Sequence, residues 1–365
     1  MKLTIQLKLQ PTAEQADALR RTLHRANEAC VYISRVAFSA RTFRQFAIHR
    51  LVYADVRETF GLAAQLAVRC IGKVSDAYKL DKKVLRTFQP LGAIPYDDRI
   101  LSFNQQASKV SIWTLDGRQS IPFVCGERQR QLLQSQRGET DLALVNGEWY
   151  LFAVCDVETP APIDVEGVLG VDLGVTNIAT DSDGTIHQGK ALKNIRYRHR
   201  SLRNKLQRKR TQGARRRLRK LAGQERRFAT WVNHNLSKRI VATAEGTKRA
   251  IALEDLTHIR TRITARKSQR ATLHSWAFFQ LRAFIVYKAA LAGVPVHFVD
   301  PRNTSRTCPA CGRIDKRNRK TQAAFVCIAC GLAGLADVIA AGNISRRAVV
   351  NQPYYPDAEQ SVAPG

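Results

Sequence analysis

The stretch GVLGVDLGVTNIATDSDGTIHQG, residues 167–189, decides the fold of the second half of this chain. It predicts an apolar strand, a turn, a second strand and a hairpin at SDG. A further apolar strand, RAIALEDL, follows at residues 249–256, then a helix from about residue 273 to residue 291 and a strand in VPVHFVD. Such an alternation of strands with a helix is typical of an α/β domain.

Three carboxylates occupy unusual places in this half of the chain. Asp172 lies inside the first apolar strand, Glu254 ends the strand AIALE, and Asp337 begins the helix-like segment ADVIAAGNISRRA. A charged group buried in an apolar strand is costly unless something pairs with it. Converging carboxylates hold Mg²⁺ well, and two such ions can activate water for phosphodiester hydrolysis. Taken singly, each residue also fits an ordinary turn or helix cap.

Four of the eight cysteines fall in TCPACGRIDKRNRKTQAAFVCIACG, residues 307–331. Cys308 and Cys311 form one C-x-x-C pair, Cys327 and Cys330 form the other, and the interval of fifteen residues is typical of a zinc ribbon. Four thiolates around one Zn²⁺ leave no open coordination position, so this ion is expected to be structural.

The charge of the chain indicates a polyanionic partner. The formal net charge is +29 over 365 residues, a length that suggests two or three domains. Residues 191–229 contain sixteen Lys or Arg and a single acidic residue, Glu225. A solvated helix face normally mixes both signs, so we interpret this segment as a phosphate-binding arm. The residues expected to contact nucleic acid are Arg203, Lys205, Arg208, Lys209, Arg210, Arg215, Arg216, Arg217, Arg219 and Lys220.

No segment offers the roughly 18 uninterrupted apolar residues of a membrane-spanning helix, because Lys288 and Pro295 break the best candidate. The N-terminus has no apolar signal-peptide core either, so we expect a cytoplasmic protein without a membrane partner.

The first half of the chain has a different sequence pattern. A short alternating strand, KLTIQLKL, precedes a capping-box pattern at Thr12 and Gln15, and apolar positions with helical spacing follow to about residue 87. These positions form one face from Leu19 to Ala37 and a second from Val56 to Val74. Residues 88–160 contain short β-rich runs with DG and NG turn signals, which indicate a small antiparallel sheet or barrel that the first strand could join.

Six motifs together resemble one known family, the TnpB proteins of insertion sequences, which are RNA-guided nucleases akin to the type V CRISPR effectors. They stand in the family's order, and they are GVDLGVTNIAT, LEDL, SWAFFQLRAFIVYKA, GVPVHFVDPRNTSRTCPACG, FVCIACG and ADVIAAGNI. The resemblance is dense from about residue 167 to residue 344 and looser near the start.

This resemblance implies that Asp172, Glu254 and Asp337 are the acidic residues of a RuvC-like nuclease with the RNase H fold. The implied order of domains is a wedge-like β-barrel at 1–10 and 88–160, a helical recognition insertion at 11–87, the RuvC-like domain at 167–303 and 332–350, the zinc ribbon at 304–331, and a disordered tail at 351–365.

The function implied is that of a Mg²⁺-dependent, RNA-guided DNA endonuclease in the prokaryotic cytoplasm, at the nucleoid. It would use two catalytic Mg²⁺ ions, one structural Zn²⁺, a guide RNA from the transposon end and a double-stranded target beside a short motif read by the N-terminal half.

One position departs from the family pattern, which commonly has Asn two residues after the last acidic residue, where this chain has Ile339. A lost polar neighbour could weaken the geometry of a metal ligand. Two alternatives therefore stay open: a catalytically weak or inactive RNA-guided DNA-binding regulator, and a DNA transposase that uses the same acidic fold.

Overall fold

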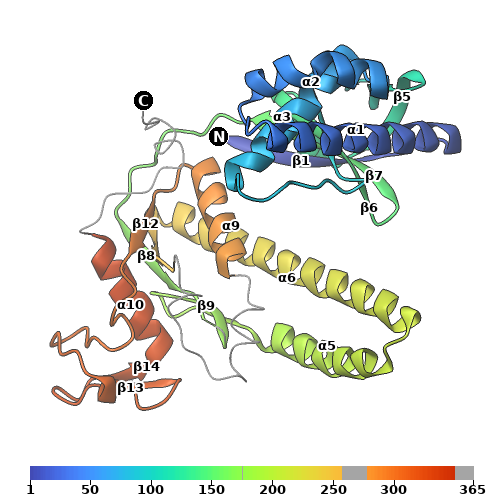
Figure 1. The fold of residues 1–365 in the computed structure, drawn as a ribbon. Coiled ribbons are helices and arrows are strands. Elements are labelled where there is room, and N and C mark those ends of the chain that lie inside the picture. Colours follow the sequence, from blue (N-terminus) through green and yellow to red (C-terminus); the bar gives the residue numbers. More distant parts are fainter. Residues whose placement is uncertain (175, 257–277, 350–365) are drawn as a thin grey trace. The chain divides into compact units, whose positions relative to one another are not determined.

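The computed structural model describes residues 1–174, 176–256 and 278–349, and the chain divides into two compact units, Met1–Val157 and Glu158–Gly365 (Figure 1). The tail predicted at 351–365 and the first residues of the helix predicted from about residue 273 lie outside the described residues. Within the described ranges, no helix is both long enough and apolar enough to cross a membrane.

The first unit is built on a seven-stranded antiparallel sheet with the order β2-β6-β7-β1-β5-β4-β3. Only four residues, 97–100, join the edge strands β2 and β3, so the sheet curls into a nearly closed barrel, as the turn signals predicted. Its strands are β1 (Lys2–Leu9), β2 (Ile94–Tyr96), β3 (Leu101–Asn104), β4 (Lys109–Thr114), β5 (Gly117–Val124), β6 (Gln136–Val145) and β7 (Glu148–Asp156).

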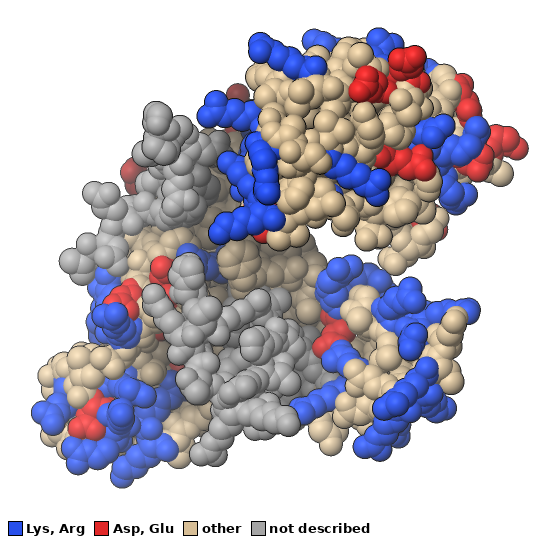
Figure 2. All heavy atoms as spheres, viewed as in Figure 1, with Lys and Arg blue, Asp and Glu red and all other residues tan. Residues whose placement is uncertain are grey.

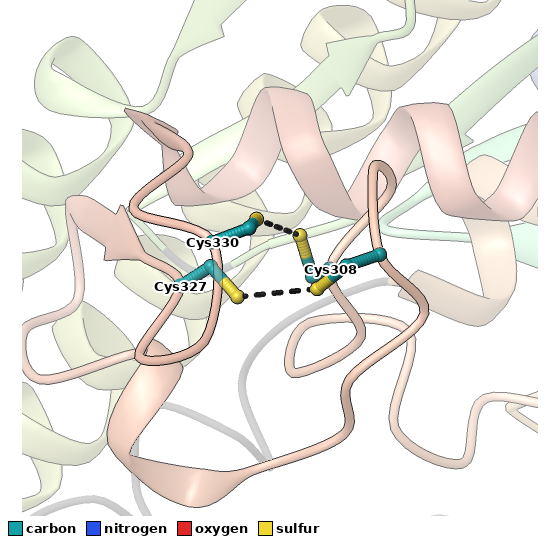
Figure 3. Close-up of side chains that lie close together, drawn as sticks. Cys308, Cys327 and Cys330 are labelled. Carbon is teal, nitrogen blue, oxygen red and sulfur yellow. Dashed lines mark hydrogen bonds between the residues drawn. The ribbon is translucent and has the colours of Figure 1, made fainter.

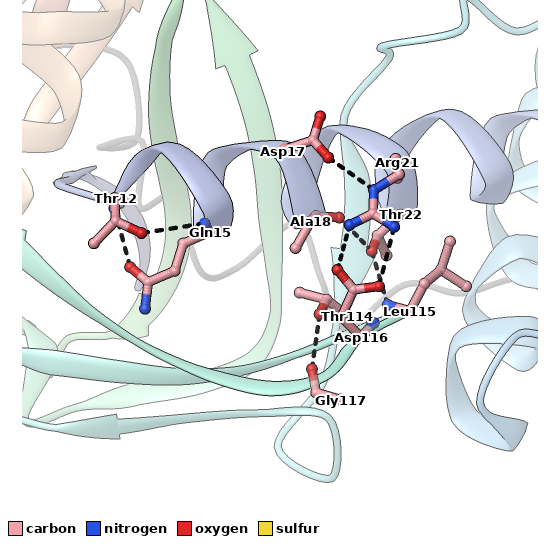
Figure 4. Close-up of polar contacts among 10 residues, drawn as sticks. All are labelled: Thr12, Gln15, Asp17, Ala18, Arg21, Thr22, Thr114, Leu115, Asp116 and Gly117. Carbon is pink, nitrogen blue, oxygen red and sulfur yellow. Dashed lines mark hydrogen bonds and ion pairs between the residues drawn. The ribbon is translucent and has the colours of Figure 1, made fainter.

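Three helices lie between β1 and β2, and a fourth lies between β5 and β6. They are α1 (Ala13–Ser39), α2 (Gln45–Phe60), α3 (Ala64–Leu80) and α4 (Glu127–Leu133). The predicted capping box is present: the Thr12 hydroxyl accepts from the amide of Gln15, whose side chain accepts from the amide of Thr12 (Figure 4). The guanidinium of Arg21 then ties α1 to Asp116 in the β4–β5 turn through two hydrogen bonds of 2.5 and 3.2 Å.

The two apolar faces predicted in this half had different outcomes. The face from Leu19 to Ala37 is buried along α1, as predicted. The face from Val56 to Val74 is not one helix, because Gly61 adopts φ +63° and ends α2 there. Left-handed backbone at a helix C-terminus favours glycine, and α3 starts anew at Ala64.

The second unit contains a five-stranded mixed sheet with the order β10-β9-β8-β11-β12. Strands β8, β11 and β12 are parallel, and β9 runs antiparallel to β8 and β10. The strands are β8 (Gly167–Asp172), β9 (Asn177–Asp181), β10 (Ile186–Gln188), β11 (Arg249–Glu254) and β12 (Val296–Val299).

Both faces of this sheet are covered, which explains why its central strands are apolar throughout. Leu169 and Leu253 pack in one core with residues of α6 and α9, whereas Val168 and Ala252 pack with α10 on the opposite face. Among the described residues of this unit, the helices are α5 (Lys190–Lys209), α6 (Gln212–Gly246), α9 (Phe278–Leu291) and α10 (Ala336–Ala348).

Between β12 and α10 the chain forms a small cysteine-rich module with its own hairpin. It contains a 3₁₀ turn, η1 (Lys316–Asn318), and two paired strands, β13 (Ala324–Val326) and β14 (Ala333–Leu335). Phe325 is fully buried in its small core. We call residues 304–331 the ribbon from here on.

Candidate active site and metal centre

Two of the predicted acidic residues end neighbouring parallel strands. Strand β11 pairs with β8 so that Leu253 lies opposite Val171, and each of these residues is followed directly by a carboxylate, Glu254 or Asp172. Carboxyl ends of parallel strands meet at one edge of the sheet, the usual position of functional groups in an open α/β sheet. The pairing register of β8 and β11 therefore brings the two carboxylates together, although they are 82 residues apart in the sequence.

The third acidic residue, Asp337, stands in the first turn of α10, where the helix dipole favours a negative charge. This helix lies directly on β8: the hydroxyl of Ser345 donates to the carbonyl of Val168 at 2.7 Å. The strand has Gly170 at the point of contact, and a Cβ there would lie 2.0 Å from the carbonyl oxygen of Ala341. The close approach of α10 brings Asp337 to the edge where β8 ends.

Burial disfavours the charged forms of Asp172 and Glu254. Burial raises the pKa of Asp172 to about 7, and the negative charges of Glu254 and Asp337 push it in the same direction. Burial also raises the pKa of Glu254, against the hydrogen bond from Thr304. Carboxylates that are buried together in this way are stabilised by a bound cation, so their environment suits an oxygen-seeking divalent ion.

Polar side chains already hold two of the three carboxylates. Asn177 donates to Oδ2 of Asp337 at 2.9 Å, and Arg319 of the ribbon donates to Oδ1 at 2.8 Å. The hydroxyl of Thr304 donates to Oε1 of Glu254 at 2.5 Å. The three carboxylates are neighbours, but their oxygens are not gathered as tightly as the cysteine sulfurs described next.

The four predicted cysteines converge on one point. Their sulfur atoms lie within 4.8 Å of one another, the one such group of ligand atoms found in the described residues. The sulfurs of Cys308 and Cys330 are 3.5 Å apart, as are those of Cys311 and Cys327 (Figure 3). Tetrahedral Zn–S bonds of about 2.3 Å place sulfurs about 3.8 Å apart, so the cluster fits an ion such as Zn²⁺.

The two halves of the cluster are built alike. In each, the carbonyl of the first cysteine accepts the amide of a glycine at 3.0 Å, and that glycine, Gly312 or Gly331, has φ near +73°. Residues other than glycine rarely adopt this backbone, so the CPACG and CIACG sequences encode the same tight turn twice. The backbone N–H groups of Cys330 and Ala329 lower the pKa of Cys327 to about 6, which favours the thiolate that binds metal.

The structure gives Ile339 a packing role. Its side chain joins the small core of the ribbon with Phe325 and Cys327, and its Cδ1 lies 3.5 Å from the position that a Cβ on Gly334 would take. The polar neighbours of Asp337 come instead from Asn177 and Arg319. The sequence stretches quoted above contain Asn177, Thr304 and Arg319, but only the fold shows which carboxylate each one contacts.

The predicted nucleic-acid contacts lie on the helical hairpin formed by α5 and α6, which turns at Arg210 with φ +51°. Nine of the ten side chains are exposed, whereas Arg203 is half-buried and pairs with Glu225. Figure 2 shows Lys and Arg side chains gathered over the end of this hairpin, at the lower right, and over the ribbon, at the lower left. Both are parts of the second unit.

Two protein-family models match the second unit and the last residues of the first. The model described as "Probable transposase", OrfB of IS605, matches residues 152–258 and therefore includes Asp172 and Glu254. The model described as "Cas12f1-like, TNB domain" matches residues 278–344, which include the ribbon and Asp337.

Curated relatives match about half of the chain. The CRISPR-associated endodeoxyribonuclease Cas12f1 of Sulfoacidibacillus thermotolerans is 35% identical over 217 residues, which are 54% of this chain and 50% of that protein. The TnpB-like protein MJ0751 of Methanocaldococcus jannaschii is 30% identical over 199 residues, 51% of this chain and 70% of that protein. The chain thus matches about half the length of the first relative and more than two thirds of the second.

A solved structure, titled as a cryo-EM structure of the Cas12f1-sgRNA-target DNA complex, contains a similar chain. It superposes with a TM-score of 0.63 at 16% sequence identity, and the match covers 92% of this chain and 83% of the other. The likeness extends over both units and shows a shared fold. The match to MJ0751, at 30% identity over 70% of that protein, shows that this chain belongs to the family of TnpB-like proteins.

Proposed function

We propose that this protein is an RNA-guided DNA endonuclease of the TnpB type, and that its second unit is a RuvC-like nuclease domain. The observation that carries the proposal is the placement of three carboxylates, Asp172, Glu254 and Asp337, around the end of β8. Burial and the neighbouring negative charges make ionisation of Asp172 unfavourable, and a bound cation would offset that cost. The relatives named as endonucleases support the same reading.

The three carboxylates would hold the catalytic Mg²⁺, in a two-ion site as in other phosphodiester hydrolases. Their donor set fits this ion, because all ligands are hard carboxylate oxygens and the site is partly buried. Bound Mg²⁺ would supply an activated water and neutralise charge on the leaving oxygen. The protein's own part is to orient the ligands, which Asn177 does for Asp337 through its hydrogen bond to Oδ2.

The remaining parts of the chain receive roles within this proposal. The wedge-like barrel is 1–10 with 88–160, the recognition helices are 11–87, the nuclease domain is 167–303 with 332–350, and the ribbon is 304–331. The first unit would read the short target-adjacent motif. The exposed side chains of the α5–α6 hairpin would bind backbone phosphates of the guide RNA or of the double-stranded DNA target. The protein would act at the prokaryotic nucleoid.

The ribbon would hold a structural Zn²⁺ and so fix the approach of the third acidic residue. Six residues separate Cys330 from Asp337, and Arg319 and Ile339 connect the ribbon to the start of α10. A closed four-thiolate site has no position for water, so the zinc takes no part in hydrolysis.

Two other functions were open from the sequence. A non-cleaving regulator was favoured only by Ile339, and the packing of that residue in the ribbon core gives it another explanation. A transposase is favoured by the description of the family model at 152–258. It predicts strand joining in addition to cutting, so the products of a DNA reaction separate it from the nuclease.

The guide RNA is the first test of the proposal. We would express the gene with its native flanking DNA, purify the protein and sequence the RNA that accompanies it. One discrete, structured RNA that ends in sequence from beyond the gene would support the proposal. Random cellular RNA on intact, folded protein would contradict it and would favour a guide-independent DNA-binding protein.

A further inference from the structure

The loop that leads from β12 into the ribbon reaches one carboxylate of the candidate active site. Thr304 is 3% exposed, and its hydroxyl donates to Oε1 of Glu254 at 2.5 Å. Hydrogen bonds from a hydroxyl to a carboxylate are short and strong when the acceptor is charged. No described residue donates a hydrogen bond to the other oxygen, Oε2. The contact therefore fixes the carboxylate and leaves one oxygen for a ligand.

The backbone of this loop is itself held by α10. The side-chain amide of Asn343, which is 5% exposed, donates to the carbonyls of Thr304 and Thr307, both at 2.8 Å. One Arg347 nitrogen, Nη1, donates to the carbonyls of Asp300 and Arg302 at 2.8 and 2.7 Å. Helix α10 thus holds the loop over most of its length, from the end of β12 to the residue before Cys308.

Asp337 stands in the first turn of the same helix. A continuous chain of contacts consequently runs from Glu254 through Thr304 to Asn343, and along α10 back to Asp337. Without these contacts, the relative position of Glu254 on β11 and Asp337 on α10 would depend only on the packing of α10 against the sheet. Here a hydroxyl and an amide also join the two elements.

We propose that Thr304 is a positioning residue for metal binding: its hydroxyl sets the orientation of the Glu254 carboxylate toward the ion shared with Asp172 and Asp337, and Asn343 sets the position of Thr304. This inference rests on the acidic site of the proposed function. Hydrogen-bond partners of metal ligands typically change metal affinity by about 10–100-fold when they are removed.

The test is the affinity of the full-length, zinc-loaded protein for Mn²⁺, titrated by electron paramagnetic resonance without nucleic acid. Mn²⁺ accepts the same oxygen ligands as Mg²⁺ and is visible by this method. Thr304→Val keeps the shape of the side chain and removes the hydroxyl, so we expect the Mn²⁺ affinity to fall about 10-fold or more. Thr304→Ser keeps the hydroxyl and is expected to bind Mn²⁺ within about 3-fold of the wild type.

The matched control is Thr307→Val in the same loop, because the Thr307 hydroxyl donates only to the backbone carbonyl of Asn303, at 2.8 Å. It is expected to leave the Mn²⁺ affinity unchanged. Thr304→Ala is a second variant without a hydroxyl, smaller than the first, and must weaken Mn²⁺ binding as well. Melting temperatures of all variants show whether a lower affinity reflects a loss of fold.

Glu254→Gln separates this inference from the proposed function. Weak Mn²⁺ binding by Glu254→Gln together with wild-type binding by folded Thr304→Val would overturn the positioning role and leave the acidic site intact. Wild-type Mn²⁺ binding by Glu254→Gln would overturn both, because the carboxylate would then not be a ligand. Equal losses in Thr304→Val and Thr307→Val would also overturn the inference, since the effect would belong to the loop and not to the hydroxyl.

Discussion

The carbonyl oxygen of Ala341 lies so close to Gly170 that a Cβ added to the glycine would come within 2.0 Å of it. A backbone atom cannot yield as the end of a flexible side chain can, so this contact sets the distance between α10 and β8. Because Asp337 is on α10 and Asp172 ends β8, the same contact sets the spacing of two of the three carboxylates.

Gly170→Ala is therefore expected to separate α10 from the sheet and to destabilise the protein by about 3 kcal/mol or more. Thermal unfolding followed by circular dichroism measures the effect. Gly342→Ala is the control in α10, since no atom of the described residues lies within 4 Å of a Cβ there. It is expected to stabilise α10 by roughly 0.5–1 kcal/mol. Equal melting temperatures for the two variants would show that α10 does not pack closely on β8 at Gly170.

The stability of the protein should depend on pH through Asp172. Its pKa is about 7 in the folded protein, against an ordinary value of 3.8, so the native state binds more protons than the unfolded state between these values. Stability from this group is therefore complete at low pH and is lost as the pH rises toward 7. In buffer without divalent ions, Asp172→Asn is expected to stabilise the protein by roughly 2–4 kcal/mol at pH 8 and by little at pH 4.

Asp183→Asn is the control of opposite sign. Two hydrogen bonds from Arg249, of 2.5 and 2.7 Å, lower the pKa of Asp183, so its charged form stabilises the fold above its ordinary pKa. This variant is expected to lower the melting temperature at neutral pH. A gain from Asp172→Asn that is the same at pH 4 and pH 8 would contradict the assigned burial of that carboxyl group.

The purified protein is expected to contain one zinc ion per chain, measured by inductively coupled plasma mass spectrometry. Changing Cys308 and Cys327 together to Ser should remove the zinc and lower the melting temperature, because the ribbon core packs around the buried sulfurs. Cys125→Ser, at a half-buried cysteine outside the ribbon, should keep both properties. A full zinc content in the double variant would rule out the four-cysteine site.

Salt dependence tests the α5–α6 hairpin. Arg215, Arg216 and Arg217 are exposed and form no ion pair within the described part of the chain. Replacing all three by Gln should weaken RNA binding and reduce the slope of log K against log salt by roughly 2, since each phosphate contact on a single strand contributes about 0.7. Fluorescence anisotropy of a labelled RNA over a series of NaCl concentrations measures this slope.

The matched control removes three positive charges that are already paired with carboxylates. Lys8 pairs with Glu148 at 3.0 Å, Lys79 with Asp76 at 2.7 Å, and Arg25 with Glu28 at 3.4 Å. Changing these three to Gln should alter the salt slope less than the hairpin variant does. The same slope in both triple variants would mean that net charge, and not the hairpin, determines RNA binding.

The sequence was most informative where local chemistry determines structure. The apolar strands around Asp172 and Glu254, the helix that starts beside Asp337 and the paired cysteines were all predictable, because periodicity and ligand spacing act over a few residues. The interruption at Gly61 was missed, because the apolar spacing continues across it while the backbone does not.

Contacts between segments that are distant in the sequence could not be predicted from it. Asn177 and Asp337 are 160 residues apart, and Thr304 and Glu254 are 50 apart, so neither hydrogen bond leaves a local pattern. Ile339 illustrates the same limit: the sequence showed only a missing polar residue, whereas the fold shows a side chain in the ribbon core.

Cleavage of DNA by the purified RNA complex tests the central claim most directly. A double-stranded DNA that matches the co-purified guide RNA, flanked by a randomised motif library, would be incubated with the wild type and with Asp172→Asn, Glu254→Gln and Asp337→Asn. We predict Mg²⁺-dependent cutting without strand joining by the wild type, and a loss of about 100-fold or more in each variant while RNA binding is retained. Undiminished cutting by any of the three variants would contradict the proposed active site.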